Sequence, residues 1–183
     1  MKFLDHLEEW LIASLMGAAT IVIFLAVLHR YLSGFPIPGV QDFLIKINTS
    51  WAQELTIYMF VWMAKFGAAY GVRTGIHVGV DVLINQLKPA RRTQFIIFGL
   101  LAGAAFTGIV GTLGASFVWE IGHTDQTSAD MEIPMWWVYL AIPLGSYLMC
   151  FRFLQVTWAF IKTGQLPKHD HAHVEGLEEE VKA

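Results

Sequence analysis

The sequence contains few charged residues and a single cysteine. Only 15% of its 183 residues are Asp, Glu, Lys or Arg, against about 25% in an average soluble domain. The cysteine, Cys150, lies in an apolar stretch, so no disulfide forms within the chain, and the residue is expected to be a small buried hydrophobe. The scarcity of charge excludes an ordinary soluble domain.

The chain also lacks the motifs of common enzymes and of nucleic-acid-binding proteins. It has no phosphate-binding loop, no nucleophile elbow, no HExxH pair and no paired cysteines. It has no basic patch, and its formal net charge is -3. We therefore expect a protein that is not an enzyme, that holds no cofactor and that binds no nucleic acid.

Long apolar stretches are present instead, and hydrophobic residues make up 55% of the chain. A membrane-spanning helix needs about 20 such residues. The predicted fold is an all-α polytopic membrane protein with four transmembrane helices and short interfacial helices. One membrane domain is predicted at residues 1–163, and a disordered acidic cytoplasmic tail at 164–183. The spans are predicted at residues 10–32, 51–71, 95–118 and 134–158.

Two linkers have apolar residues at helical spacing but are too short to span a membrane. They lie between Val40 and Ile47 and between Val78 and Leu87, and each predicts a short helix in the interface. Pro143 predicts a kink in the fourth span. In the third span, small residues predict a face for close helix packing, formed by Gly99, Gly103, Gly111 and neighbouring alanines.

Basic residues are concentrated in the loop between the second and third spans. The loop at residues 119–132, between the third and fourth spans, contains no Lys or Arg. The positive-inside rule then predicts that both termini and the basic loop are cytoplasmic, with the acidic loop outside. The basic residues of the second loop are Arg73, Lys88, Arg91 and Arg92.

The second span carries a polar face. Glu54, Tyr58, Trp62 and Lys65 follow at spacings of four, four and three, so they share one side of a helix that should face protein. A lysine at the centre of a span costs about 2.5–3.5 kcal/mol on insertion scales. Its ammonium either extends to lipid phosphate or a loop, or pairs with a protein carboxylate, and both alternatives stay open. Arg152 in the fourth span raises the same question.

Several of these positions form a pattern that resembles a known family. The chain resembles the small membrane subunit of tripartite ATP-independent periplasmic (TRAP) transporters over roughly residues 5–162, and it is most similar to the C4-dicarboxylate branch. The matching elements are Trp51-x-x-Glu54, Tyr58-x-x-x-Trp62, Gly67-Ala68-Ala69, Arg73-x-x-x-His77-x-x-x-Asp81, Ile133-Pro134-x-Trp136 and Ile142-Pro143-x-Gly145.

The resemblance implies a non-catalytic role in the bacterial inner membrane. Such subunits accompany a large multi-span permease that holds the substrate and sodium sites, while a periplasmic binding protein delivers the substrate. The small subunit would extend the scaffold of the permease, offer part of the docking surface and contact membrane lipids. Lys65 stands where the family more often has an apolar residue, so no role for it carries over from the family. The candidate interface or structural residues are Glu54, Tyr58, Trp62, Lys65, Arg73, His77, Asp81 and Arg152.

Two other classes of protein are alternatives. The first is the membrane anchor of a haem or quinone respiratory complex, but axial ligands would have to project from within spans. His29 lies at a helix end, and His77 and His123 lie in loops. The second is an independent carrier, which the absence of a Gly/Pro-broken pair of helices disfavours. The tail could bind a metal ion weakly, although a solvated tail is favoured; its histidines are His169, His171 and His173.

Overall fold

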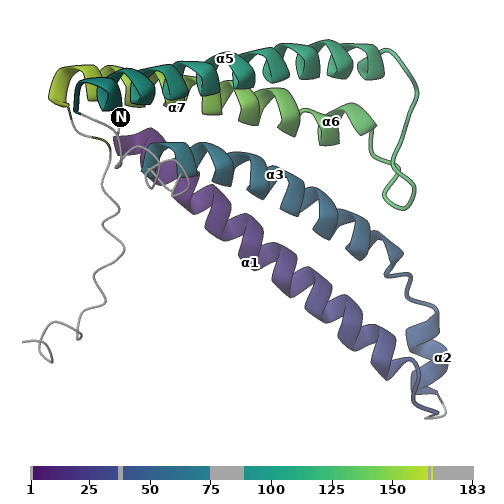
Figure 1. The fold of residues 1–183 in the computed structure, drawn as a ribbon. Coiled ribbons are helices and arrows are strands. Elements are labelled where there is room, and N and C mark those ends of the chain that lie inside the picture. Colours follow the sequence, from purple (N-terminus) through teal and green to yellow (C-terminus); the bar gives the residue numbers. More distant parts are fainter. Residues whose placement is uncertain (1, 37–38, 75–88, 165, 167–183) are drawn as a thin grey trace, which may run out of the picture.

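The computed structural model describes residues 2–36, 39–74, 89–164 and 166. Four long helices make up most of this part of the chain (Figure 1). They are α1 (Lys2–Leu32), α3 (Ser50–Thr74), α5 (Pro89–Gly122) and α7 (Ala141–Thr163). The two short helices are α2 (Val40–Ile45) and α6 (Met135–Tyr139).

Four helical segments are long and apolar enough to cross a membrane. The described residues contain no β-strand beyond one isolated bridge between Thr127 and Pro134. The predicted class, an all-α protein with four membrane-spanning helices, is therefore confirmed. The four segments are His6–Leu32, Ser50–Thr74, Arg91–Gly122 and Met135–Thr163.

The helices are longer than the predicted spans, because charged residues that flank the apolar stretches also adopt helical structure. At the start of the chain, α1 already includes the acidic stretch before Trp10. The interfacial helix predicted between Val78 and Leu87 lies outside the described residues. So does the predicted tail, apart from Gly164 and Leu166. Gly164 ends α7 in the left-handed conformation, with φ 68°, which favours glycine.

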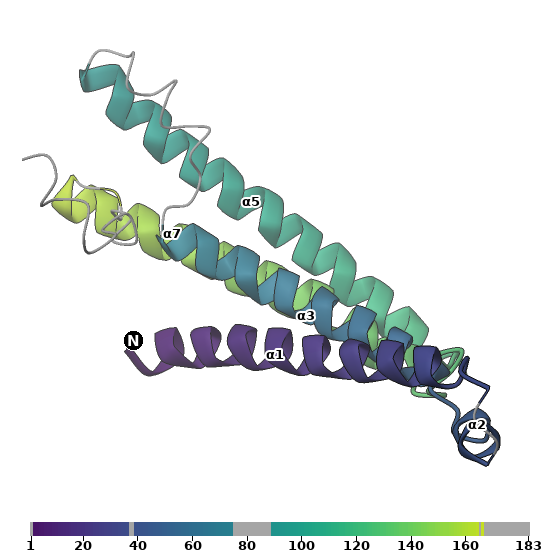
Figure 2. The same ribbon diagram turned by 90° about the horizontal axis from the view of Figure 1, so that it is seen from below.

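The long helices lie in the order α1, α3, α7, α5. α3 packs against α1 and α7, and α5 packs against α7. Figure 2 shows α3 over α7, with α1 and α5 on opposite sides. Figure 1 shows that the α1–α3 pair diverges from the α5–α7 pair toward the end that carries α2. The arrangement is an open row, so each long helix keeps a broad apolar face exposed.

Close packing of α5 against α7 depends on glycines of α5 that face rings of α7. A Cβ atom on Gly103 would lie 2.8 Å from the ring of Phe153, and one on Gly111 would lie 3.0 Å from the ring of Tyr147. Any larger residue would push these rings away. The prediction of a small-residue packing face is confirmed at these two positions.

Gly99 takes no part in this packing, and the prediction there is wrong. A Cβ atom on Gly99 would have nothing within 4 Å. Figure 2 shows that α5 separates from α7 toward the end where Gly99 lies. Larger side chains, Ile96 and Phe160, form the buried contact at that end. Spacing along α5 therefore identified the small-residue face. Which glycines of that face contact α7 depends on how the two helices cross.

The fourth span is interrupted between α6 and α7 at Leu140. Pro143 has no N–H group to donate to the carbonyl of Tyr139, four residues earlier, and its ring would clash with that carbonyl in a continuous helix. Within the first turn of a new helix the missing N–H group has no helical acceptor in any case. The change predicted at Pro143 corresponds to this one-residue break in the helix, three residues before the proline.

Candidate functional site

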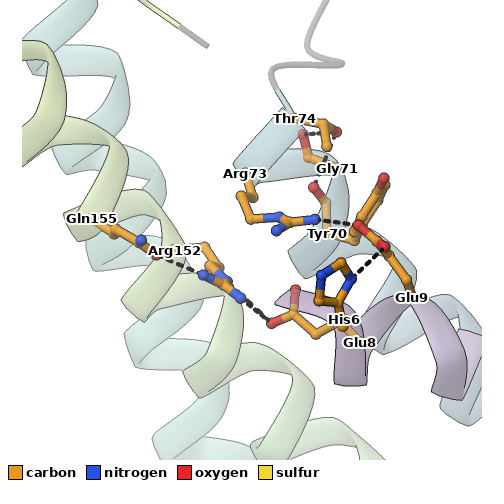
Figure 3. A network of polar contacts seen from close by, with 9 residues as sticks. All are labelled: His6, Glu8, Glu9, Tyr70, Gly71, Arg73, Thr74, Arg152 and Gln155. Atoms are coloured by element: carbon orange, nitrogen blue, oxygen red, sulfur yellow. Dashed lines mark hydrogen bonds and ion pairs between the residues drawn. The ribbon is translucent and has the colours of Figure 1, made fainter. Parts of the chain in front are cut away.

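Four charged residues join three helices at the end of the molecule where the N-terminus lies (Figure 3). Glu8 and Glu9 lie on α1, Arg73 lies in the last turn of α3, and Arg152 lies in α7. We call these four residues the Glu–Arg cluster. Each arginine faces one of the two adjacent glutamates in Figure 3.

Arg152 forms a buried ion pair with Glu8. Its Nη2 and Nε atoms donate to Oε1 of Glu8 at 2.7 and 3.1 Å, and its Nη1 atom donates to Oε1 of Gln155 at 2.7 Å. The two charged side chains are only 1% and 2% exposed. Charge-assisted hydrogen bonds of this kind are the strong ones in proteins. For Arg152, then, the structure shows a protein carboxylate as the partner.

Arg73 forms the second ion pair of the cluster in a more open position. Its Nη2 atom lies 2.8 Å from Oε1 of Glu9, and the two side chains are 20% and 44% exposed. Its guanidinium group also lies 4.8 Å from the centre of the Tyr70 ring, a cation–π distance. His6 lies 3.6 Å from the other carboxylate oxygen of Glu9. This pair connects α1 to α3, whereas the buried pair connects α1 to α7.

Glu8 was not among the candidates from the sequence. A signal was available in the helical spacing, because residues at intervals of four, three and four share one face of α1. These residues are Glu8, Ile12, Leu15 and Ala19, and all four are buried or half-buried in the structure. The carboxylate therefore lies on the packed face of α1, where a carboxylate needs a cationic partner.

At the opposite end of the molecule, Glu54 binds the backbone of the loop between α5 and α6. Its Oε1 atom accepts a hydrogen bond from the N–H of Ala129 at 3.1 Å, and Oε2 accepts from those of Asp130 and Met131, each at 2.9 Å. The hydroxyl of Tyr58, one turn further along α3, also donates to Oε1. We call this arrangement the Glu54 anchor.

The loop held by the Glu54 anchor is itself closed by hydrogen bonds. The N–H of Ser128 donates to the carbonyl of Ile133 at 2.8 Å, and the N–H of Met135 donates to the carbonyl of Gln126 at 2.9 Å. Glu132 has a φ of 54°, in the left-handed region. Successive N–H groups that converge on one carboxylate form a backbone anion site, here filled from within the chain. The exposed acidic residues of the loop are Asp125, Asp130 and Glu132.

The other candidates on α3 lie nearer its middle. A Cβ atom on Gly145 would lie 2.5 Å from the Cβ atom of Lys65, so α3 and α7 cross closely there. Trp62 stacks on Phe66 at 5.9 Å between ring centres. The predicted polar face thus contacts three elements: Glu54 binds the loop, the hydroxyl of Tyr58 lies 3.9 Å from the sulfur of Met135 in α6, and Lys65 packs on α7. His77 and Asp81 lie outside the described residues.

His29 has a structural role at the end of α1. Its Nε2 atom donates to the carbonyl of Leu44 at 3.0 Å, and its Nδ1 atom accepts from the hydroxyl of Thr49 at 3.3 Å. Both ring nitrogens are engaged in holding α2 and the start of α3. Within the part of the chain that the structure describes, no group of three or more His, Cys, Asp or Glu residues is placed to hold a metal ion.

The family model described as "Tripartite ATP-independent periplasmic transporters, DctQ component" matches residues 19–163. This chain belongs to the DctQ family. The resemblance seen in the sequence is confirmed, and the family is a non-enzymatic transport component of the inner membrane.

Relatives of this DctQ family member share most of its length. The C4-dicarboxylate TRAP transporter small permease protein of Rhodobacter capsulatus is 55% identical over 98% of this chain and 87% of its own length. The protein of the same description in Vibrio cholerae is 34% identical over 94% of this chain and 78% of its own. The sialic acid TRAP transporter permease protein SiaT of Haemophilus influenzae is 27% identical over 90% of this chain, but over only 24% of its own length.

Proposed function

We propose that the chain is the small permease subunit of a TRAP transporter that moves a C4-dicarboxylate, or a closely similar small organic acid, across the inner membrane. The observation that carries this proposal is the 55% identity, over nearly the whole chain, with a small permease protein described as a C4-dicarboxylate transporter component. In this proposal the sodium gradient drives transport, and the chain itself performs no chemistry.

A large permease subunit is the expected partner, and the chain would extend its scaffold. The SiaT relative supports this, because the region similar to this chain is only 24% of a much longer permease protein. The open row of helices supports it too. In the most apolar window of α1 only 6% of residues are buried, so this helix has an apolar face that a partner or lipid must cover.

The proposed orientation places the end of the bundle nearer the Glu–Arg cluster on the cytoplasmic side and the end with the Glu54 anchor on the periplasmic side. The support is the positive-inside rule, because Arg73, Arg91 and Arg92 all lie toward the end that carries the N-terminus. The anchored loop, with its exposed acidic residues, would then face the periplasm and help to dock the substrate-binding protein. Reporter fusions at Asp125 and Lys168 test this orientation, with an external and an internal signal expected respectively.

Affinity purification of the chain from its native membrane in mild detergent tests the proposed function. Mass spectrometry of the bound proteins should find a large multi-span permease in roughly stoichiometric amount. Recovery of the chain alone, or with a haem- or flavin-containing partner, would contradict the proposal. Absorbance spectra of the same sample identify haem or flavin directly.

A further inference from the structure

Two cations lie far from the ends of their helices, and they differ in whether they have an ion-pair partner. Arg152 lies eleven residues before the end of α7, and Lys65 lies nine residues before the end of α3. Arg152 is neutralised by Glu8 from another helix of the same chain. Lys65 has no ion-pair or hydrogen-bond partner among the residues that the structure describes. A charge at this depth requires a partner, because hydrocarbon does not solvate it.

The position of Lys65 limits where its ammonium group can go. Its Cβ atom lies at the crossing of α3 and α7, against Gly145, and the side chain is half-buried. The helix end is six to nine residues away, between Gly71 and Thr74, which is about 9–14 Å along the axis. Cα–Cβ bonds in a helix tilt toward its N-terminus, which here is the opposite direction. To reach lipid phosphate, the side chain would have to reverse and then extend over this distance.

The described residues of a second copy of this chain would not supply the missing carboxylate. Within the four spanning segments the described carboxylates of Glu8, Glu9 and Glu54 are already bound inside their own chain. The remaining one, Glu120, lies in the last turn of α5, at the end of the span far from Lys65. The absence of a free described carboxylate at this depth points to a different membrane protein as the source of the partner.

We propose that Lys65 forms an intramembrane ion pair with an aspartate or glutamate side chain of the large permease subunit. This inference rests on the proposed function, which supplies the partner protein, and adds the residue and the chemistry of the contact. The ion pair fixes the depth at which the permease meets α3 and α7, in the same way that Glu8 fixes the depth of α1 against α7. Arg152 would therefore fix the helices of the subunit relative to one another, and Lys65 would fix the position of the subunit in the complex.

The experiment compares four forms of the chain in its native membrane: wild type, Lys65→Leu, Lys65→Arg and Lys162→Leu. Lys162→Leu is the matched control, because it removes an exposed lysine near the end of α7, over the ring of Trp158. Lys65→Leu should lower the recovery of the large permease by roughly three- to tenfold, the size of an interhelical polar contact in a membrane. Lys65→Arg and Lys162→Leu should retain wild-type recovery, and all four chains should insert equally.

An apolar carbodiimide, which joins an amine to a carboxyl group only when the two touch, identifies the contact itself. In the wild-type complex we expect a cross-linked peptide between Lys65 and an Asp or Glu of the permease. Normal permease recovery with Lys65→Leu, or no cross-link from Lys65, overturns the proposal. Normal recovery together with loss of co-purified phospholipid overturns it in favour of lipid phosphate. If the wild-type chain recovers no permease, the proposed function fails, and this inference fails with it.

Discussion

The two ends of the molecule are held together by different chemistry. At the end of the Glu–Arg cluster, charged side chains from three helices pair with one another, and one pair is almost completely buried. At the end of the Glu54 anchor, a single carboxylate binds three backbone N–H groups of a loop. The first arrangement fixes the helices relative to one another. The second fixes a loop on the helices, so the two ends should respond differently to mutation.

The largest effect is expected from breaking the buried pair with Arg152→Leu. The carboxylate of Glu8 would be left buried without a cation, and removing one partner of such a pair costs about 3–5 kcal/mol. The midpoint of thermal unfolding in detergent should fall sharply. The double variant Glu8→Leu with Arg152→Leu should recover most of the loss, since no unpaired charge is left. A single variant that unfolds like the wild type would show that the pair does not hold this end.

The crossing of α3 and α7 lies between the two ends and should be the next most sensitive position. Gly145→Ala places a Cβ atom 2.5 Å from the Cβ atom of Lys65 and 3.3 Å from its backbone, so the helices must move apart. Overpacking of this kind costs about 1–3 kcal/mol.

Gly67→Ala on α3 is the matched control for this crossing, because a Cβ atom there would meet nothing within 4 Å. Both variants are measured by thermal unfolding in detergent. Equal stability of the two would contradict the close crossing.

Changing the Glu54 anchor should affect the loop more than the helices. In Glu54→Gln one carboxylate oxygen becomes an NH₂ group, which cannot accept from the backbone. Hydrogen exchange at the N–H groups of residues 129–131 should accelerate by roughly tenfold, as in a local opening. Global unfolding should change much less than in Arg152→Leu. Exchange at the wild-type rate would show that the loop closes without the anchor.

The smallest effect is expected at the exposed pair of the Glu–Arg cluster. Arg73→Ala removes an ion pair whose carboxylate side chain is 44% exposed, and such pairs contribute at most about 1 kcal/mol. The difference from wild type should also shrink in high salt, because exposed charges are screened. Thermal unfolding at low and high salt measures both effects. A loss of stability as large as that of Arg152→Leu would contradict the expectation that the exposed pair contributes less than the buried pair.

The fold could be predicted largely from apolar stretches. In hydrocarbon the backbone N–H and C=O groups must be hydrogen-bonded within the protein, which leaves few possible folds. The four spans and α2 follow from length and spacing. The use of individual glycines could not be predicted, since Gly99 and Gly103 share one face of α5 but only Gly103 meets α7. That difference depends on the angle between two helices, which neither helix determines alone.

The candidate site was predictable where a residue type reveals its need for a partner. Arg152 and Lys65 stand out because a cation in a span is costly. Glu8 stood at the correct helical spacing but was not among the candidates. The loop partners of Glu54 could not be found from side chains, because they are backbone N–H groups that every residue except proline possesses. A contact to the backbone therefore requires no particular residue type and cannot be recognised from the sequence.

Transport in proteoliposomes tests whether this chain is a required subunit of a sodium-driven dicarboxylate transporter. The large permease, with and without this chain, is reconstituted with its periplasmic binding protein, a radiolabelled four-carbon dicarboxylate and an inward sodium gradient. We expect uptake of the dicarboxylate that requires this chain and stops when the sodium gradient is removed. Full uptake by the large permease alone, or uptake by this chain without the permease, would contradict it.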